Sequence, residues 1–175
     1  MFGKSFFTVT AFLLAAALSI AKPISVGNPD INHLTTINST TSFCLFLPPK
    51  PGMEIGSHEH DAVVFCTRPN PVAPKAKLLP KNFIKTAHFK KTQDWVQITG
   101  RMNPSAYQLS RKDGGGQYDN RGAPAQSGCA GYTFFVSLIE PDTGKYCIRC
   151  CNKKNDCDMG LSTEGCSVVI PGNYK

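Results

Sequence analysis

The chain has 175 residues, of which 41% are hydrophobic, and its 19 basic side chains outnumber the 12 acidic ones to give a formal net charge of +7. The length fits one domain. A domain of about 150 residues buries roughly 70% of the surface that its unfolded chain exposes, which excludes a miniature scaffold that depends on cross-links alone.

The first 21 residues have the pattern of a secretory signal peptide. Lys4 precedes the uncharged apolar run 6–20, and small residues occupy positions −3 and −1 of a cleavage site before Lys22. The run is shorter than the roughly 20 apolar residues of a membrane span. We therefore expect residues 1–21 to be removed and the remaining chain to be secreted, extracellular and without a membrane span.

Residues 22–42 are polar, rich in Pro, Asn, Ser and Thr, and show no repeating apolar pattern. We interpret them as a flexible leader before a single disulfide-rich domain over residues 43–175. The leader contains the N-glycosylation acceptor Asn38-Ser39-Thr40. Secretion therefore predicts a glycan on Asn38.

The cysteines follow the leader, and their even number in an exported chain predicts disulfide bonds rather than a zinc site. Cys147-x-x-Cys150 is the only C-x-x-C pair, and no second metal-binding pair follows it at the spacing of a zinc finger. We expect no free thiol. The predicted disulfide cysteines are Cys44, Cys66, Cys129, Cys147, Cys150, Cys151, Cys157 and Cys166.

Eight cysteines allow 105 pairings, and their positions favour some over others. Cys44 and Cys66 are isolated at the front of the chain, so we expect them to pair with each other. Cys129 is expected to join the C-terminal cluster. Cys150 and Cys151 should reach different partners, because the side chains of neighbouring residues diverge.

Short apolar runs bounded by Pro, Gly or polar residues predict strands throughout the chain. Between the first two runs and the rest, residues 68–81 carry four prolines and predict a long surface loop. Residues 83–89 and 95–102 predict a hairpin with the five-residue loop 90–94. The predicted strands are residues 43–47, 62–67, 83–89, 95–102, 132–139, 145–150 and 168–170.

The glycine-rich residues 110–128 show no periodicity and predict a long irregular segment. Residues 104–110 predict one short helical turn, and we find no convincing amphipathic helix. Residues 132–139 form the strongest strand candidate and should pair with 145–150 across a turn sequence. The prediction is an all-β domain, or β with minor helix: a single disulfide-stapled, loop-rich domain of antiparallel sheet.

Residues 62–93, which we call the basic segment, contain seven basic side chains and no acidic one. Such a concentration of charge favours anionic partners such as acidic glycans, lipid head groups or nucleic acid. The alternative is a solvated, lysine-rich loop. Nucleic acid is disfavoured, because only Phe83 and Phe89 interleave the cations as stacking rings. The candidate anion contacts are Arg68, Lys75, Lys77, Lys81, Lys85, Lys90 and Lys91.

The motif His58-Glu59-His60-Asp61 has the side chains that bind metals. In an extended conformation both histidines would lie on one side, as in the first half of a cupin metal motif. The later ligands of that motif are missing, so we interpret these residues as surface polar groups. We predict no metal and no cofactor.

Support for catalysis is weak. The chain has no G-x-S-x-G motif. A glycosidase needs two carboxylates that face one bond, and Asp113 and Asp119 flank the loop 113–119 without any local pattern that joins them. This loop also lacks the residues of a phosphate-binding loop. Exposed aromatic faces near it would suit a sugar surface, and burial in the core is the alternative. The candidate glycan contacts are Trp95, Tyr107 and Tyr118.

Four runs of the chain carry a resemblance to known proteins: 43–52 (FCLFLPPKPG), 94–100 (DWVQITG), 113–119 (DGGGQYD) and 146–151 (YCIRCC). They resemble small cysteine-rich secreted proteins of fungi. The resemblance would extend from residue 43 to residue 174, and it implies extracellular residence with a role at the cell wall or a host interface. It implies no activity and no functional residue.

These observations lead to two functional hypotheses. The first is a secreted, non-enzymatic, effector-like monomer at the cell surface or host interface, which binds a polymer or a protein partner through the basic segment. The alternative is a carbohydrate-active module, either a cell-wall glycan binder or a weak hydrolase that uses acids near the glycine-rich loop.

Overall fold

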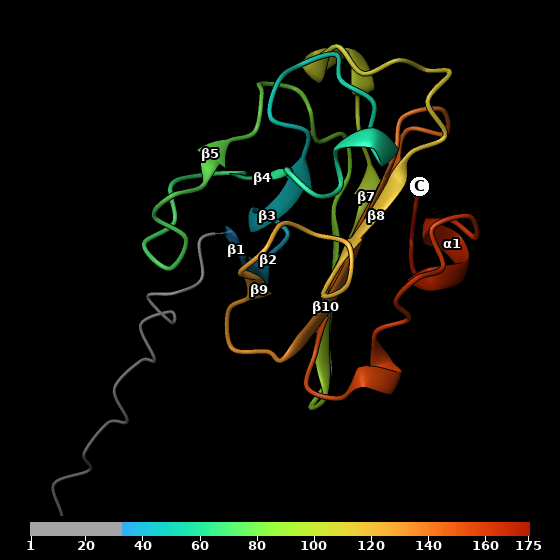
Figure 1. Ribbon diagram of the computed structural model, residues 1–175. Helices are drawn as coiled ribbons and strands as arrows, with labels where there is room; N and C mark the ends of the chain where they lie inside the picture. Colours follow the sequence, from blue (N-terminus) through green and yellow to red (C-terminus); the bar gives the residue numbers. More distant parts are fainter. Residues whose placement is uncertain (1–32) are drawn as a thin grey trace, which may run out of the picture.

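The computed structural model describes residues 33–175 (Figure 1), so the predicted signal peptide lies outside the described residues. Strands β1 to β11 form most of the regular structure. The α-helix α1 (Cys166–Val169) is a single turn, and the short 3-10 helices are η1 (Gly56–His58), η2 (Pro104–Tyr107) and η3 (Lys154–Asp156). The prediction of a β fold with minor helix is confirmed, as is the helical turn after residue 103.

One sheet has four strands in the order β2-β3-β4-β5. These are β2 (Ile37–Ser39), β3 (Ser42–Leu47), β4 (Val63–Cys66) and β5 (Lys77–Leu78). All six residues of β3 are buried, and β3 is an interior strand of this sheet. Strands β3 and β4 confirm the two strands predicted at the front of the domain.

A second sheet is antiparallel and has five strands in the order β6-β7-β11-β10-β8. The strands are β6 (His88–Lys91), β7 (Trp95–Arg101), β11 (Lys145–Cys151), β10 (Phe134–Glu140) and β8 (Gly116–Asp119). The predicted hairpins correspond to β6–β7 and β10–β11. Strand β6 begins later than predicted and includes Lys90 and Lys91 of the predicted loop, while Ile84 makes only an isolated bridge to Met102.

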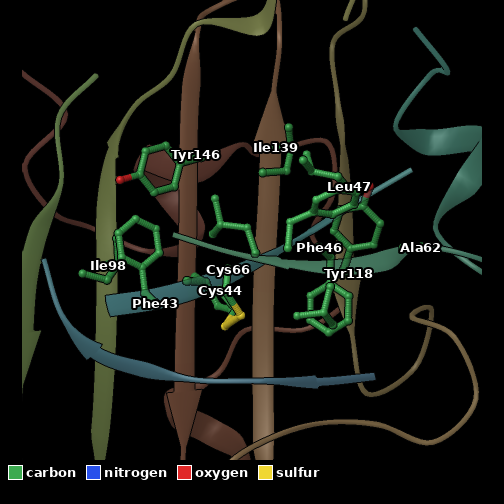
Figure 2. Close-up of a cluster of buried hydrophobic side chains, with 14 of the residues drawn as sticks. Phe43, Cys44, Phe46, Leu47, Ala62, Cys66, Ile98, Tyr118, Ile139 and Tyr146 are labelled. Atoms are coloured by element: carbon green, nitrogen blue, oxygen red, sulfur yellow. A yellow bond between two sulfur atoms is a disulfide. The ribbon is translucent and has the colours of Figure 1, made fainter. Parts of the chain in front are cut away.

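The five-stranded sheet is the middle layer of the domain, with the four-stranded sheet on one side and α1 on the other (Figure 1). The main core fills the space between the sheets, where strands β3 and β4 run across the strands of the larger sheet (Figure 2). Phe46 stacks on Tyr118 and Phe135, with ring centroids 5.6 and 5.2 Å apart, and Phe43 stacks on Tyr146. Fully buried aromatic rings contribute much of the apolar area that stabilises such a core.

A second, smaller core lies on the opposite face of the five-stranded sheet. Val136 and Leu138 from β10 contact Val169 and Ile170 from the C-terminal segment. Alternate residues of a strand point to opposite faces of its sheet, which is why one strand can serve both cores. The C-terminal segment therefore forms the third layer.

The predicted flexible leader needs correction over residues 33–42. Strand β1 (His33–Thr35) pairs in parallel with β9 (Ser127–Cys129) and is followed by β2. Thr35 and Thr36 are buried, and their hydroxyl groups find partners: Thr35 Oγ1 donates to the Cys44 carbonyl at 2.9 Å, and Thr36 Oγ1 accepts from Asn70 Nδ2 at 2.7 Å. Polar composition suggested a solvated leader, but satisfied hydroxyl groups can be buried at little cost.

Two further predictions were wrong. The glycine-rich residues 110–128 contain β8 and the start of β9 rather than only irregular chain. Residues 168–170 were predicted as a strand, but Val168 and Val169 belong to α1. The turn of α1 begins after Gly165, whose φ of 75° favours glycine, and a disulfide from Cys166 to β11 fixes it against the sheet.

Candidate functional site

The basic segment lies on the surface of the domain. It runs from β4 through β5, the outermost strand of the four-stranded sheet, to β6, the outermost strand of the five-stranded sheet. The proline-rich part is mostly irregular, as predicted, apart from the two residues of β5. All of the candidate anion contacts are exposed: Arg68, Lys75, Lys77, Lys81, Lys85, Lys90 and Lys91.

Few acidic groups neutralise these cations. Two contact aromatic rings instead: the Nζ of Lys77 lies 5.7 Å from the centroid of Phe65, and that of Lys90 lies 5.5 Å from the centroid of Trp95. Such contacts leave the positive charge in place. Four others form no ion pair with a described residue, namely Arg68, Lys81, Lys85 and Lys91.

Two of the three candidate glycan-contact residues are buried, so the prediction that they form a sugar-binding surface is wrong. Tyr118 is fully buried and stacks on Phe46 in the main core. Tyr107 is 4% exposed, donates a hydrogen bond to the Pro48 carbonyl at 2.8 Å and packs edge-on against Phe65. Burial raises the pKa of Tyr107 to about 12. Both tyrosines therefore stabilise the core.

The third candidate, Trp95, is partly buried among cationic side chains. The guanidinium carbon of Arg149 lies 4.6 Å from the ring centroid, and Lys90 contacts the same ring. Arg149 donates from Nε and Nη2 to Gln97 Oε1 at 2.9 and 2.8 Å, and from Nη1 to the Asp156 carbonyl at 3.0 Å. Burial lowers the pKa of Arg149. These contacts occupy much of the ring, so Trp95 acts mainly in packing.

The carboxylates near the glycine-rich loop accept hydrogen bonds from the backbone. Asp113 accepts from the amides of Ile55 and Gly115 at 2.9 and 2.8 Å. Asp119 is 3% exposed and accepts from the amides of Arg121 and Gly122 through Oδ1. Carboxylates that accept backbone hydrogen bonds in this way order the loops around them.

Glu59 was not singled out as a structural residue, yet it connects its loop to strand β8. Its Oε1 accepts a hydrogen bond from the Gln117 amide at 2.7 Å. Burial raises the pKa of Glu59, the hydrogen bond from Gln117 lowers it, and the charge of Asp119 raises it further. A Cβ on Gly116 would lie 2.5 Å from the same oxygen, so the glycine allows the close approach.

The histidines beside Glu59 contact each other and Asp61. His58 Nδ1 lies 3.1 Å from Asp61 Oδ1, and its ring stacks on that of His60 with centroids 6.5 Å apart. Across residues 33–175, no group of three His, Cys, Asp or Glu side chains is placed to hold a metal ion.

The disulfides follow the predicted pattern, and residues 33–175 contain no free cysteine. The two isolated cysteines pair with each other across β3 and β4, and Cys129 joins the C-terminal cluster. The adjacent cysteines on β11 have different partners, as expected. The pairs are Cys44–Cys66, Cys129–Cys150, Cys147–Cys166 and Cys151–Cys157.

Two other surface features were weighed as sites. Asn38 is exposed on β2, so a glycan there would displace no buried side chain. A shallow, open depression of about 230 Å³ lies between Arg121, Lys154 and Leu161, beside the disulfide of Cys157. Ligand pockets usually bury most of a small molecule, and an open depression does not. The exposed basic segment is thus the strongest candidate site.

Comparison with known proteins finds curated relatives but no family model. No family model matches the chain, and no solved structure gives a significant match. Within residues 33–175, no helix has the length and apolar character that a membrane span requires. The four disulfides fit an extracellular protein.

The chain is similar to two curated proteins of Mycosarcoma maydis. It is 30% identical over 157 residues to Appressorium protein ROW1, a match that covers 79% of this chain and 36% of that protein. It is 29% identical over 156 residues to Appressorium protein ROW2, covering 79% of this chain and 53% of that protein. The chain therefore matches between a third and about half of the length of these relatives, both of which are named for the fungal appressorium.

Proposed function

We propose that this chain is a secreted, non-enzymatic fungal protein of the host interface, where its basic segment binds an acidic polysaccharide. The observation that carries the proposal is the exposure of all seven cations of residues 62–93, a segment without any acidic side chain. The names of the two relatives support a location at the appressorium, and the disulfides support an extracellular one.

The arrangement of the cations favours a polymer over a small anion. They follow the chain from the edge of one sheet to the edge of the other, and none of them lines the depression beside Cys157. An acidic polysaccharide carries charges along its length and can contact many separated cations at once. Each contact is weak and screened by salt, so affinity would come from their number.

The alternative of a carbohydrate-active module has less support. Tyr107 and Tyr118 are buried, and the guanidinium group of Arg149 packs over the ring of Trp95. Asp113 and Asp119 both accept backbone hydrogen bonds that order the loops around them. A hydrolase would need other acids than those that the sequence indicated.

Retention on immobilised polygalacturonate tests the proposed contact surface. Replacement of Lys77, Lys81 and Lys85 by Gln should weaken retention about tenfold, since each exposed charge contact contributes roughly 0.5 kcal/mol. The matched control replaces three exposed lysines outside the segment, Lys50, Lys112 and Lys154, and removes the same net charge. Equal loss in both variants would mean that net charge alone drives retention and would contradict the proposal.

Secretion needs its own test. A tagged chain expressed in a fungal host should appear in the culture medium, and N-terminal sequencing of the secreted protein should begin at Lys22. Retention of the full-length chain inside the cells would contradict the extracellular assignment without bearing on the basic segment.

A further inference from the structure

The two edges of the five-stranded sheet differ in how they are closed. At one edge, all four residues of β8 are buried, and the Gln117 amide is occupied by Glu59 Oε1. At the other edge, Phe89, Lys90 and Lys91 of β6 are all exposed. An uncovered edge strand presents backbone donors and acceptors that can pair with another chain.

The hydrogen-bond pattern shows which groups of β6 face outward. In an antiparallel pair, every second residue bonds to the partner strand and the residues between them point away. The Thr92 amide bonds to the Trp95 carbonyl at 2.8 Å, and the Thr86 amide bonds to the Arg101 carbonyl at 3.2 Å. Both pairs belong to the register that matches His88 with Thr99.

It follows that residues 88 and 90 bond to β7, whereas Phe89 and Lys91 turn their amides and carbonyls to the open side. Pairing on the other side of β7 agrees with this alternation: the Asp94 backbone carbonyl accepts from the Asn152 amide, and the Met102 amide donates to the Gly144 carbonyl. No hydrogen bond to a described residue uses the outward groups of Phe89 or Lys91.

The charge around this edge selects the kind of strand that would fit. Lys85, Lys90 and Lys91 are exposed along it, and β6 itself carries no acidic residue. Lysines on an edge strand oppose pairing with a second copy of the same strand, because like charges would meet. The same lysines would attract an acidic strand.

We propose that β6 is a strand-addition site that binds an acidic, extended segment of a partner protein. The segment would pair with the outward amides and carbonyls of Phe89 and Lys91, and its carboxylates would lie near the lysines of the edge. The exposed ring of Phe89 would contact an apolar side chain of the added strand. Strand addition at β6 depends on backbone pairing and is independent of polysaccharide binding.

An acetylated and amidated hexapeptide of alternating Glu and Thr is a suitable probe. Titration followed by amide NMR should show slower hydrogen exchange at Phe89 and Lys91, while the amides of residues 88 and 90 are protected already. A hexapeptide of alternating Lys and Thr is the charge control and should not bind. Protection at the edge by both peptides, or by neither, would overturn the proposal.

Proline substitution separates backbone pairing from charge. Phe89→Pro removes an amide that β7 does not use, a position where an edge strand tolerates proline. The peptide should bind this variant at least about fivefold more weakly than Phe89→Ala, which keeps the amide. Lys91→Pro and Lys91→Ala form a second pair in case Phe89→Pro fails to fold. Equal affinity of the proline and alanine variants would show charge attraction alone and refute strand addition.

Sedimentation of the unliganded chain tests whether a second copy of this chain pairs with β6 instead. A monomer at micromolar concentration is expected. A dimer that dissociates in Phe89→Pro but persists in Phe89→Ala would assign the edge to a second copy of this chain and overturn the acidic partner.

Discussion

Cys150 and Cys151 are neighbours on β11, yet their disulfides lie on opposite faces of the five-stranded sheet. Cys150 belongs to the main core and bonds Cys129, whereas Cys151 belongs to the smaller core and bonds Cys157. Strand alternation makes this divergence necessary. One strand thereby anchors a layer on each side of the sheet.

The two disulfides should differ in their contribution to stability. Replacement of Cys129 and Cys150 by Ala is expected to lower the free energy of unfolding by about 3 kcal/mol, and replacement of Cys151 and Cys157 by about 2 kcal/mol, because a longer loop loses more entropy on closure. The sequence separations are 21 and 6 residues. Urea unfolding of both variants measures the difference, and a greater cost for the shorter loop would contradict this expectation.

The two buried tyrosines should respond differently to the loss of a hydroxyl group. Tyr107→Phe is expected to lower the free energy of unfolding by about 1 kcal/mol, since the Pro48 carbonyl loses its donor. Tyr118→Phe should be neutral or stabilising, because the Tyr118 hydroxyl has no hydrogen-bond partner among the described residues. Urea unfolding at neutral pH compares them, and equal destabilisation would argue that a partner of Tyr118 exists.

Glu59 should make the stability of the domain depend on pH. Burial raises its pKa, so the folded protein binds this proton more tightly than the unfolded chain does. The contribution of Glu59 is complete below its unfolded pKa and is lost as the pH rises through the folded pKa. Between pH 4 and pH 7, the stability of Glu59→Gln relative to the natural chain should therefore rise, by less than about 1 kcal/mol because solvent screens this partly exposed group. Chemical unfolding at both pH values measures the change, and a constant difference would contradict the shift.

Arg149 should be sensitive even to a conservative change. Arg149→Lys keeps the charge but loses the planar contact with Trp95 and the paired donors to Gln97, and we expect it to cost about 2 kcal/mol. Trp95 is the only tryptophan, so its emission should shift to longer wavelength as the ring becomes more hydrated. Lys90→Gln removes the other, exposed cation and should cost about 0.5 kcal/mol. Similar costs for both variants would argue against a structural role for the Arg149 hydrogen bonds.

The local signals that predicted the hairpins were sufficient because they require no distant partner. Tyr132 to Ile139 and Lys145 to Cys150 are apolar runs on either side of a turn sequence, and strands β10 and β11 pair there in register. The charge of the basic segment also predicted its exposure. In the hairpins and the basic segment, the composition and the turn residues predict the same structure that the burial of the side chains shows.

The missed features depend on contacts between distant residues. Gly115 and Gly116 gave β8 the composition of a loop, but Gly116 is needed because Glu59 packs against it. Val168 and Val169 favour a strand by propensity, and the disulfide of Cys166 together with the start at Gly165 places them in a helical turn. The spacing of the aromatic residues in the sequence does not indicate which rings are buried, as Tyr107 and Tyr118 illustrate.

Strand β1 has a consequence for the order in which the domain can fold. It is the first strand of the described chain to be synthesised, yet its parallel partner β9 follows β8 in the sequence. Thr35 therefore cannot pair with Cys129 until most of the chain has been synthesised. Contacts between such distant residues slow folding, because the loop between them must close first. Cys44–Cys66 can form early from a short hairpin-like segment. The N-terminal strand is therefore expected to lock into place late, after most of the domain has emerged, and its docking would complete the folded state rather than begin it.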